Sequence, residues 1–201
     1  MKRVIHCIPA ALTAMCLIMA CSCGTASHLD YDSISTEGIR TVRVKPFAMK
    51  ANGKWLRLSL ERSVDTDNKE GWCLVADYYL PFLTGDKMCF HLDDGSKVTL
   101  TVTNISRTER RRESVLTPQG EKTLRPGTYR AMFPVSEQTL QQLCGRATEE
   151  ITGHSDNAGW SMKISKDYIM DFPWYIESAR DVINGRLELQ KKNMDWTKIV
   201  I

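Results

Sequence analysis

Three residues whose types could form a catalytic set, Cys89, His91 and Asp93, alternate along one short stretch of the chain. A thiol needs a base within hydrogen-bond distance, near 3 Å, to act as a nucleophile. Residues two apart on a strand share a face, but they lie about 6.6 Å from each other. The spacing therefore favours an exposed strand face, and we predict no catalytic residue in this stretch.

Basic residues gather in a predicted hairpin arm over residues 107–130. Its charged members are Arg107, Arg110, Arg111, Arg112, Lys122, Arg125 and Arg130 against Glu109, Glu113 and Glu121, a local charge of +4. Arginine binds phosphate, sulfate and carboxylate groups through paired hydrogen bonds. Charge runs usually mark a solvated hairpin of mixed charge, which is the interpretation we favour. An anionic-ligand site at Arg107, Arg110, Arg111 and Arg112 is the alternative.

The cysteines beyond the N-terminal region are Cys73, Cys89 and Cys144. Cys73 and Cys89 fall on predicted neighbouring strands with the same parity, so a disulfide between them is one alternative. The other alternative, which we favour, is buried free thiols that behave as small hydrophobic groups. The sequence has no CxxC or HExxH spacing, no Gly-rich phosphate loop and no G-x-S-x-G elbow, so we predict neither a metal nor a cofactor.

Aromatic residues gather near the C-terminus, at Trp160, Trp174, Tyr175 and Trp196. Such a group could form a platform on which sugars stack. More often, aromatic residues in this position dock a terminal helix onto a sheet, where each buries about 150–250 Å². We favour docking and keep a sugar platform as the alternative.

The N-terminus predicts export. Lys2 and Arg3 precede an uncharged, largely apolar run over residues 4–20, as in a signal peptide that occupies residues 1–20. No second apolar run of that length follows, so we expect no transmembrane helix in the mature chain.

Cys21 follows the apolar run directly, and its surroundings resemble the lipobox of bacterial lipoproteins. Ile18 provides the aliphatic residue at −3 and Ala20 the small residue at −1, whereas Met19 departs from the small residue usual at −2. We therefore predict lipidation of Cys21 and a polar, flexible tether over residues 21–38. Cys23 is a poorer candidate for lipidation, because Ala20 would then stand at −3. A plain secretory signal or an uncleaved N-terminal anchor is a further alternative.

The charge of the mature chain excludes a dedicated nucleic-acid binder. The full chain has 27 basic and 24 acidic residues, and the signal peptide removes Lys2 and Arg3. The remaining 25 basic residues nearly balance the acids, whereas nucleic-acid binders carry a strong basic excess.

Residues 39–201 predict a single α+β domain. Apolar residues alternate with polar ones in segments typical of antiparallel strands, and residues 72–80 read as a central strand. Residues 93–95 form a three-residue loop, because only that register pairs Phe90 with Val98 and keeps each face uniform. Two further strands, residues 105–116 and 122–133, flank a turn at residues 117–120.

Two helices follow the strands. Ser136 is placed to cap a short helix, and Pro173 to open a longer one that runs to about residue 192. The fold that this order predicts is an antiparallel β-sandwich-like or strongly twisted sheet with a short helix and a longer C-terminal helix.

Two motifs support this interpretation through a family resemblance. Gly85-Asp86-Lys87 followed by Asp93-Asp94-Gly95, and later Phe133-Pro134-Val135-Ser136-Glu137, resemble the hairpin and helix start of small lipoproteins of Bacteroides-type bacteria. The resemblance covers the middle and later part of the domain. It implies a lipoprotein with this fold and no particular activity, because that family is largely uncharacterised.

Together these features predict a lipid-anchored protein of the cell envelope, on the periplasmic side or in the outer membrane, with a non-enzymatic binding or structural role. The expected partners are the membrane, through the N-terminal lipid, and an envelope protein or glycan. The alternative is a hydrolase acting on envelope polysaccharide or peptidoglycan, with a site assembled from distant residues. A pocket with two carboxylates or a Cys–His contact near 3 Å would favour the alternative.

Overall fold

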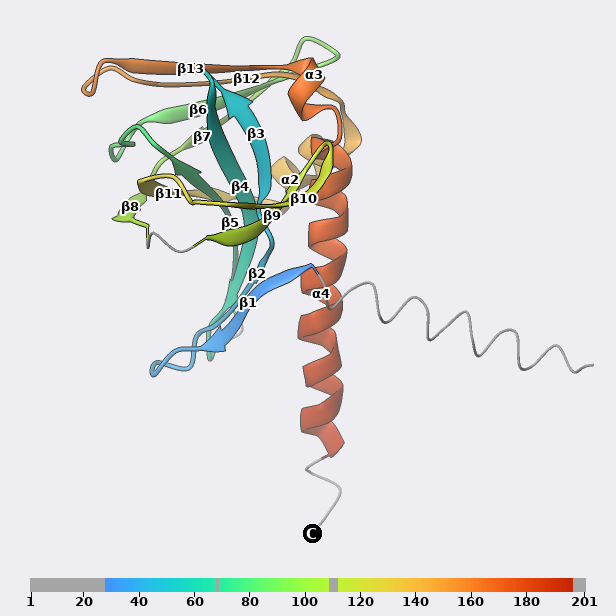
Figure 1. Ribbon diagram of the computed structural model, residues 1–201. Coiled ribbons are helices and arrows are strands. Elements are labelled where there is room, and N and C mark those ends of the chain that lie inside the picture. Colours follow the sequence, from blue (N-terminus) through green and yellow to red (C-terminus); the bar gives the residue numbers. More distant parts are fainter. Residues whose placement is uncertain (1–27, 68, 109–111, 197–201) are drawn as a thin grey trace, which may run out of the picture.

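The computed structural model describes residues 28–67, 69–108 and 112–196, with side chains as far as residue 188. Two sheets and a long C-terminal helix surround one core (Figure 1), so the predicted α+β, sandwich-like class is confirmed. The larger sheet contains β1 (Leu29–Ile34), β2 (Arg40–Val44), β3 (Phe47–Ala51), β4 (Lys54–Val64), β5 (Glu70–Tyr78), β8 (Asn104–Arg107), β9 (Glu113–Thr117), β10 (Gly120–Leu124) and β11 (Tyr129–Val135).

The order of the larger sheet is β10-β9-β3-β4-β5-β11-β8, and β1 and β2 extend it from β4. Its strand pairs are antiparallel except for the single parallel pairing of β3 with β9. β5 lies between β4 and β11, which confirms the central strand predicted at residues 72–80. β4 and β5 each have a neighbouring strand on either side, so they form the centre of the sheet and carry side chains on both of its faces.

The smaller sheet has the order β13-β12-β6-β7, formed by β6 (Lys87–Leu92), β7 (Lys97–Thr101), β12 (Thr148–Ser155) and β13 (Trp160–Ser165). Phe90 pairs with Val98 and His91 with Lys97, so the predicted register is confirmed. Gly95 has φ +81°, the left-handed conformation that the three-residue loop requires.

Three helices complete the described part of the chain: α2 (Glu137–Gly145), α3 (Lys166–Ile169) and α4 (Phe172–Trp196). The Ser136 side chain accepts a hydrogen bond from the Thr139 amide at 3.0 Å, as predicted for the cap of α2. Pro173 lies in the first turn of α4, close to the predicted start. The buried stripe of α4 contains Ile176, Ala179, Ile183 and Leu187, which confirms the predicted apolar face.

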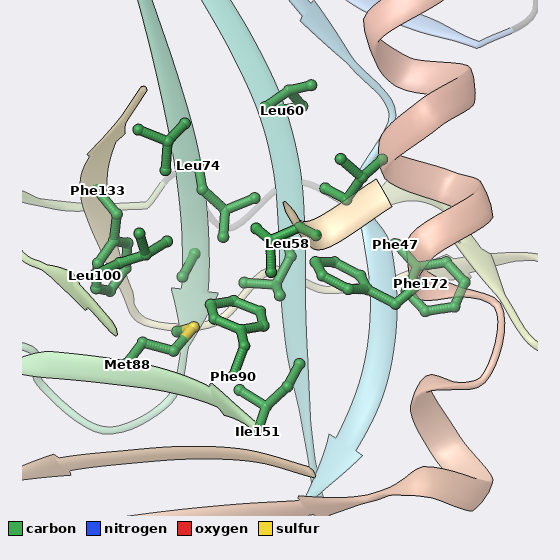
Figure 2. Packing of buried hydrophobic residues seen from close by; sticks show 14 of the residues in the cluster. Phe47, Leu58, Leu60, Leu74, Met88, Phe90, Leu100, Phe133, Ile151 and Phe172 are labelled. Atoms are coloured by element: carbon green, nitrogen blue, oxygen red, sulfur yellow. The ribbon is translucent and has the colours of Figure 1, made fainter. Parts of the chain in front are cut away.

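The core lies between the two sheets and the first half of α4. β4 and β5 contribute Leu58 and Leu74 from one side, and the smaller sheet contributes Phe90 from the other (Figure 2). Phe90 stacks on Phe172 at the start of α4, with ring centroids 5.6 Å apart and an interplanar angle of 13°. This contact joins the smaller sheet to the helix.

Two predicted boundaries are wrong. Residues 29–34 belong to β1, which pairs with β2, so the folded part begins within the predicted tether. The stretches expected to form one long hairpin are four strands, in which β8 pairs with β11 and β9 with β10. The β9–β10 pair lies at one end of the larger sheet and the β8–β11 pair at the other. Because the sheet is curved, short connections can link strands at its two ends. Only the turn between Thr117 and Gly120 is as predicted.

No helix among the described residues is long and apolar enough to cross a membrane.

Candidate functional site

One face of the larger sheet carries charged residues in a row across its central strands. Arg57 on β4 is the cross-strand partner of Asp77 on β5, and Asp77 is the partner of Arg130 on β11. Arg130 donates two hydrogen bonds to the Asp77 carboxylate, at 2.7 and 2.9 Å. The Asp77 side chain is only 5% exposed, so its carboxylate is shielded from water, whereas Arg130 is 25% exposed. Its hydrogen bonds raise the pKa of Arg130.

Arg57, beside this pair, is fully buried. Its Nη2 donates to the carboxylate of Glu113 at the start of β9. The Nε and Nη1 atoms have no hydrogen-bond partner among the described residues. β9 therefore places Glu113 over the charged face, and the ion pair with Arg57 ties the β9–β10 hairpin to the centre of the sheet.

Glu61 and Cys73 continue the same face as direct cross-strand partners. Burial raises the pKa of the Glu61 carboxyl, although the positive charges of Arg43 and Arg130 partly oppose that shift. Burial and the neighbouring Glu61 charge raise the pKa of the Cys73 thiol to about 12. A thiol held in that form is a poor nucleophile, so this pair contributes no catalytic site.

We expect Glu61→Gln to raise the stability of the protein at neutral pH. The unfolded group titrates near 4.5 and the folded group above it, so wild-type stability falls as pH rises through the range above 4.5. Glutamine removes the buried charge at constant volume. Urea unfolding at pH 4 and pH 7 should show an advantage for the variant that grows with pH. A lower stability of Glu61→Gln at pH 7 would mean that attraction to Arg43 outweighs burial.

Most arginines whose side chains the structure describes form an ion pair with an acidic residue. All of those outside the predicted arm do so, and so does Arg130 at the end of the arm. The pairs are Arg40 with Asp32, Arg43 with Asp30, Arg57 with Glu113, Arg62 with Glu70, Arg130 with Asp77, Arg146 with Asp94, Arg180 with Glu137 and Arg186 with Asp32. Arginine in this fold is therefore normally neutralised by a nearby carboxylate.

Arg107, Arg112 and Arg125 differ from that pattern. All three are exposed, and none of their side chains has a hydrogen bond or ion pair with another described residue. Of the candidate site residues, Arg107 lies at the end of β8 and Arg112 just before β9, whereas Arg110 and Arg111 lie outside the described residues. Arg125, which was not among the candidates, directly follows β10.

Arg107 and Arg125 line one pocket of about 330 Å³, together with Thr108, Pro126, Gly127 and Thr128. The pocket lies where β8 ends and where the chain passes from β10 to β11. Two arginines beside one hollow suit an anion with several oxygens, such as phosphate, sulfate or a carboxylate.

The backbone holds this pocket in a defined shape. The Thr108 amide donates to the Thr128 carbonyl at 3.2 Å, and the Thr108 hydroxyl donates to the Gly127 carbonyl. A Cβ on Gly127 would lie 2.3 Å from the Tyr78 backbone nitrogen, so only glycine permits this approach of the connection to β5. The two arginines therefore stand on a preformed backbone, which reduces the entropic cost of binding.

A second pocket, of about 450 Å³, lies on the outer face of the smaller sheet. A register shift between Thr148 and Glu150 allows both Glu149 and Glu150 to line it, beside His91. Lys166 pairs with Glu149 at 3.0 Å and Lys163 with Glu150 at 2.6 Å. The pocket thus contains two carboxylates, and each is engaged by a lysine.

The three cysteines that the structure describes, Cys73, Cys89 and Cys144, form neither a disulfide nor a catalytic pair. Cys73 lies in the larger sheet and Cys89 in the smaller one, so the expectation that their strands are neighbours is wrong, and both are free thiols. The Cys89 sulfur accepts a hydrogen bond from Thr99, whereas the His91 ring bonds to Thr152 at 3.1 Å. This agrees with the exposed strand face expected from the spacing.

Trp160 and Tyr175 are buried in the core, as expected of aromatics that dock a helix. Trp174 is 62% exposed, and the Trp196 side chain lies outside the described residues. Within the described part of the chain, no group of three or more His, Cys, Asp or Glu side chains is arranged to hold a metal ion.

Comparisons with protein-family models, curated proteins and solved structures gave no match to this chain.

Proposed function

We propose that this protein is a lipid-anchored, non-enzymatic binding module of the cell envelope, and that it binds ligands through anionic groups at Arg107 and Arg125. Export and the anchor follow from the signal-like residues 1–20 and the lipobox-like sequence before Cys21. The ligand chemistry is phosphate, sulfate or carboxylate, which envelope glycans and lipid headgroups both carry.

The observation that carries the ligand proposal is the contrast among the arginines. Arg130 forms an ion pair with Asp77. In contrast, Arg107 and Arg125 line a shared pocket, and neither has a carboxylate partner among the described residues. Like charges on one rim repel each other, so the folded chain gains nothing from their proximity. An anionic ligand between them would satisfy both groups.

The binding test uses the full-length protein with Arg107→Gln and Arg125→Gln together. We expect a loss of affinity of about tenfold for each arginine, because a charge-assisted hydrogen bond contributes about 1.5 kcal/mol or more. The probes are inorganic phosphate, inorganic sulfate, a glucuronate oligosaccharide and phosphatidylglycerol vesicles, measured by calorimetry. The last two distinguish a glycan from a lipid headgroup as the source.

Arg146→Gln is the matched control, because Arg146 is 55% exposed but pairs with Asp94 away from the pocket. If the control loses as much affinity as the double variant, the binding is a general charge effect. Failure of every probe to bind the wild-type protein would refute the ligand proposal.

Replacement of Cys21 by serine is expected to release the protein from membranes. Each buried CH₂ of an acyl chain adds about 0.8 kcal/mol of anchoring, so two or more chains hold a protein on a bilayer and their loss frees it. Membrane flotation and the intact mass of the wild-type and Cys21→Ser proteins measure this. A variant that still floats with the wild-type mass would contradict lipidation at Cys21.

The alternative, a hydrolase of envelope polysaccharide or peptidoglycan, is favoured by the pocket that contains Glu149 and Glu150 beside His91. A pair of carboxylates is the usual acid–base equipment of glycoside hydrolysis. Here a substrate would first have to displace Lys163 and Lys166. Release of sugars or muropeptides from purified envelope polymers by the wild-type protein, and not by Glu150→Gln, would support this reading, and no turnover would exclude it.

A further inference from the structure

Three large apolar side chains are exposed around the junction of α3 and α4. Tyr168 is 41% exposed, Met170 66% and Trp174 62%. They come from a stretch of seven residues, so they share one corner of the molecule. The other large exposed apolar side chains among the described residues, Tyr31 and Ile34, belong to β1.

Packing of the fold does not account for Trp174. The side of α4 that faces the core is occupied by Phe172, Tyr175 and Ile176, each at most 3% exposed. Trp174 points away from that stripe, and a tryptophan left in water forgoes the free energy that its burial would supply. Exposed apolar side chains grouped in this way mark a surface that contacts a membrane or another protein.

The N-terminal segment enters the fold beside this corner. The Lys45 amide donates to the His28 carbonyl at 2.7 Å, and the Tyr175 hydroxyl donates to the Lys45 carbonyl at 3.0 Å. His28 and Trp174 also line the same small pocket. Figure 1 shows β1 beginning next to α4. The hydrogen bonds hold the entry of the chain against the first half of α4, and the shared pocket places His28 on the side of the helix that carries Trp174.

The distance to the anchor is short. His28 lies seven positions after Cys21, and an extended chain spans at most about 3.6 Å per residue, or roughly 25 Å. An acylated Cys21 lies at the membrane surface, so the corner beside His28 stays within that distance of the bilayer. Trp and Tyr rings favour the headgroup layer, where one end of the ring is in an apolar and the other in a wet environment.

The charges next to the corner indicate the kind of surface. Glu177 and Asp181 are exposed, and they follow Trp174 at helical spacings of three and seven residues, on the same side of α4. The nearby cations Lys45 and Lys166 are already paired, with Glu121 and Glu149, so the two acids would be repelled by an anionic surface. A zwitterionic lipid such as phosphatidylethanolamine avoids that repulsion.

We propose that the corner formed by Tyr168, Met170 and Trp174 rests in the headgroup layer of the zwitterionic membrane that holds the lipid anchor. The inference rests on the proposed anchor at Cys21. It orients the domain, because β8 lies on the side of the molecule away from α4 (Figure 1), and Arg107 at the end of β8 lines the anionic-ligand pocket. The anionic-ligand site then faces away from the membrane surface.

The test is tryptophan quenching in the full-length, acylated protein reconstituted into phosphatidylethanolamine-rich vesicles with brominated acyl chains. We expect bromolipid to quench the wild-type fluorescence, and Trp174→Phe to lose most of that quenching. Trp55→Phe is the matched control, because Trp55 lies on the larger sheet between Lys50 and Lys122. Its removal should leave the quenching in place.

Flotation of the same vesicles separates the two proposals. Protein that floats without bromolipid quenching, or whose quenching survives Trp174→Phe, overturns the orientation and leaves the anchor intact. Protein that does not float overturns the anchor and the orientation together. Self-association in detergent that Trp174→Phe abolishes, without quenching in vesicles, would assign the corner to a second copy of this chain instead.

Discussion

Asp77→Ala is expected to lower the free energy of unfolding by about 3 kcal/mol or more, because it leaves buried positive charge without a partner. Asp77 is 5% exposed, accepts two hydrogen bonds from Arg130 and is the cross-strand partner of the buried Arg57. Its removal therefore leaves the partly buried Arg130 guanidinium without its partner, beside the fully buried Arg57, which keeps only Glu113. Chemical denaturation with extrapolation to water measures the loss.

The double replacement Asp77→Leu with Arg130→Met is the control for this prediction. Replacing both members of a buried pair with apolar residues often restores stability, whereas removing one member does not. We expect the double variant to recover most of the loss. If Asp77→Ala costs less than about 1 kcal/mol, the pair behaves as an exposed salt bridge and the charged face is not shielded.

Phe90→Ala is expected to cost about 3–5 kcal/mol, the usual range for removal of a buried phenylalanine. Phe90 is fully buried, pairs across the smaller sheet with Val98 and Ile151, and stacks on Phe172 at the start of α4. Alanine would leave a void where the smaller sheet, the larger sheet and the helix meet (Figure 2). Thermal and urea unfolding should both show the loss.

Phe90→Leu serves as the comparison, because it keeps an apolar side chain and removes only part of the volume. We expect it to cost clearly less than alanine. Equal losses for the two variants would mean that the aromatic stack on Phe172, rather than filled volume, supplies most of the stabilisation.

Local signals in the sequence predict much of this fold. The loop at residues 93–95 follows from the requirement that Phe90 and Val98 share a face, and Ser136 caps α2 as its residue type suggests. The apolar stripe of α4 is equally readable, since Ile176 and Ile183 recur at helical spacing. Each of these depends on neighbours close in sequence.

The parts that sequence could not predict depend on distant pairings. Alternation on β4 suggests that Arg57 faces solvent, but β9 crosses that face and buries it with Glu113. Similarly, Arg130 belongs to the basic arm by position, yet its strand pairing sets it opposite Asp77. Arg130 is therefore neutralised within the sheet and is not available to a ligand. Arg125 lines the anionic-ligand pocket only because the connection from β10 to β11 brings it next to Arg107.

Affinity capture from the native envelope, with the tagged full-length protein and its Arg107→Gln, Arg125→Gln variant side by side, measures whether the two arginines bind an anionic envelope ligand. We expect the wild-type protein to recover an acidic glycan or an anionic lipid and the variant to recover neither. Equal recovery by both proteins, or a stoichiometric protein partner captured regardless of the two arginines, would contradict this expectation.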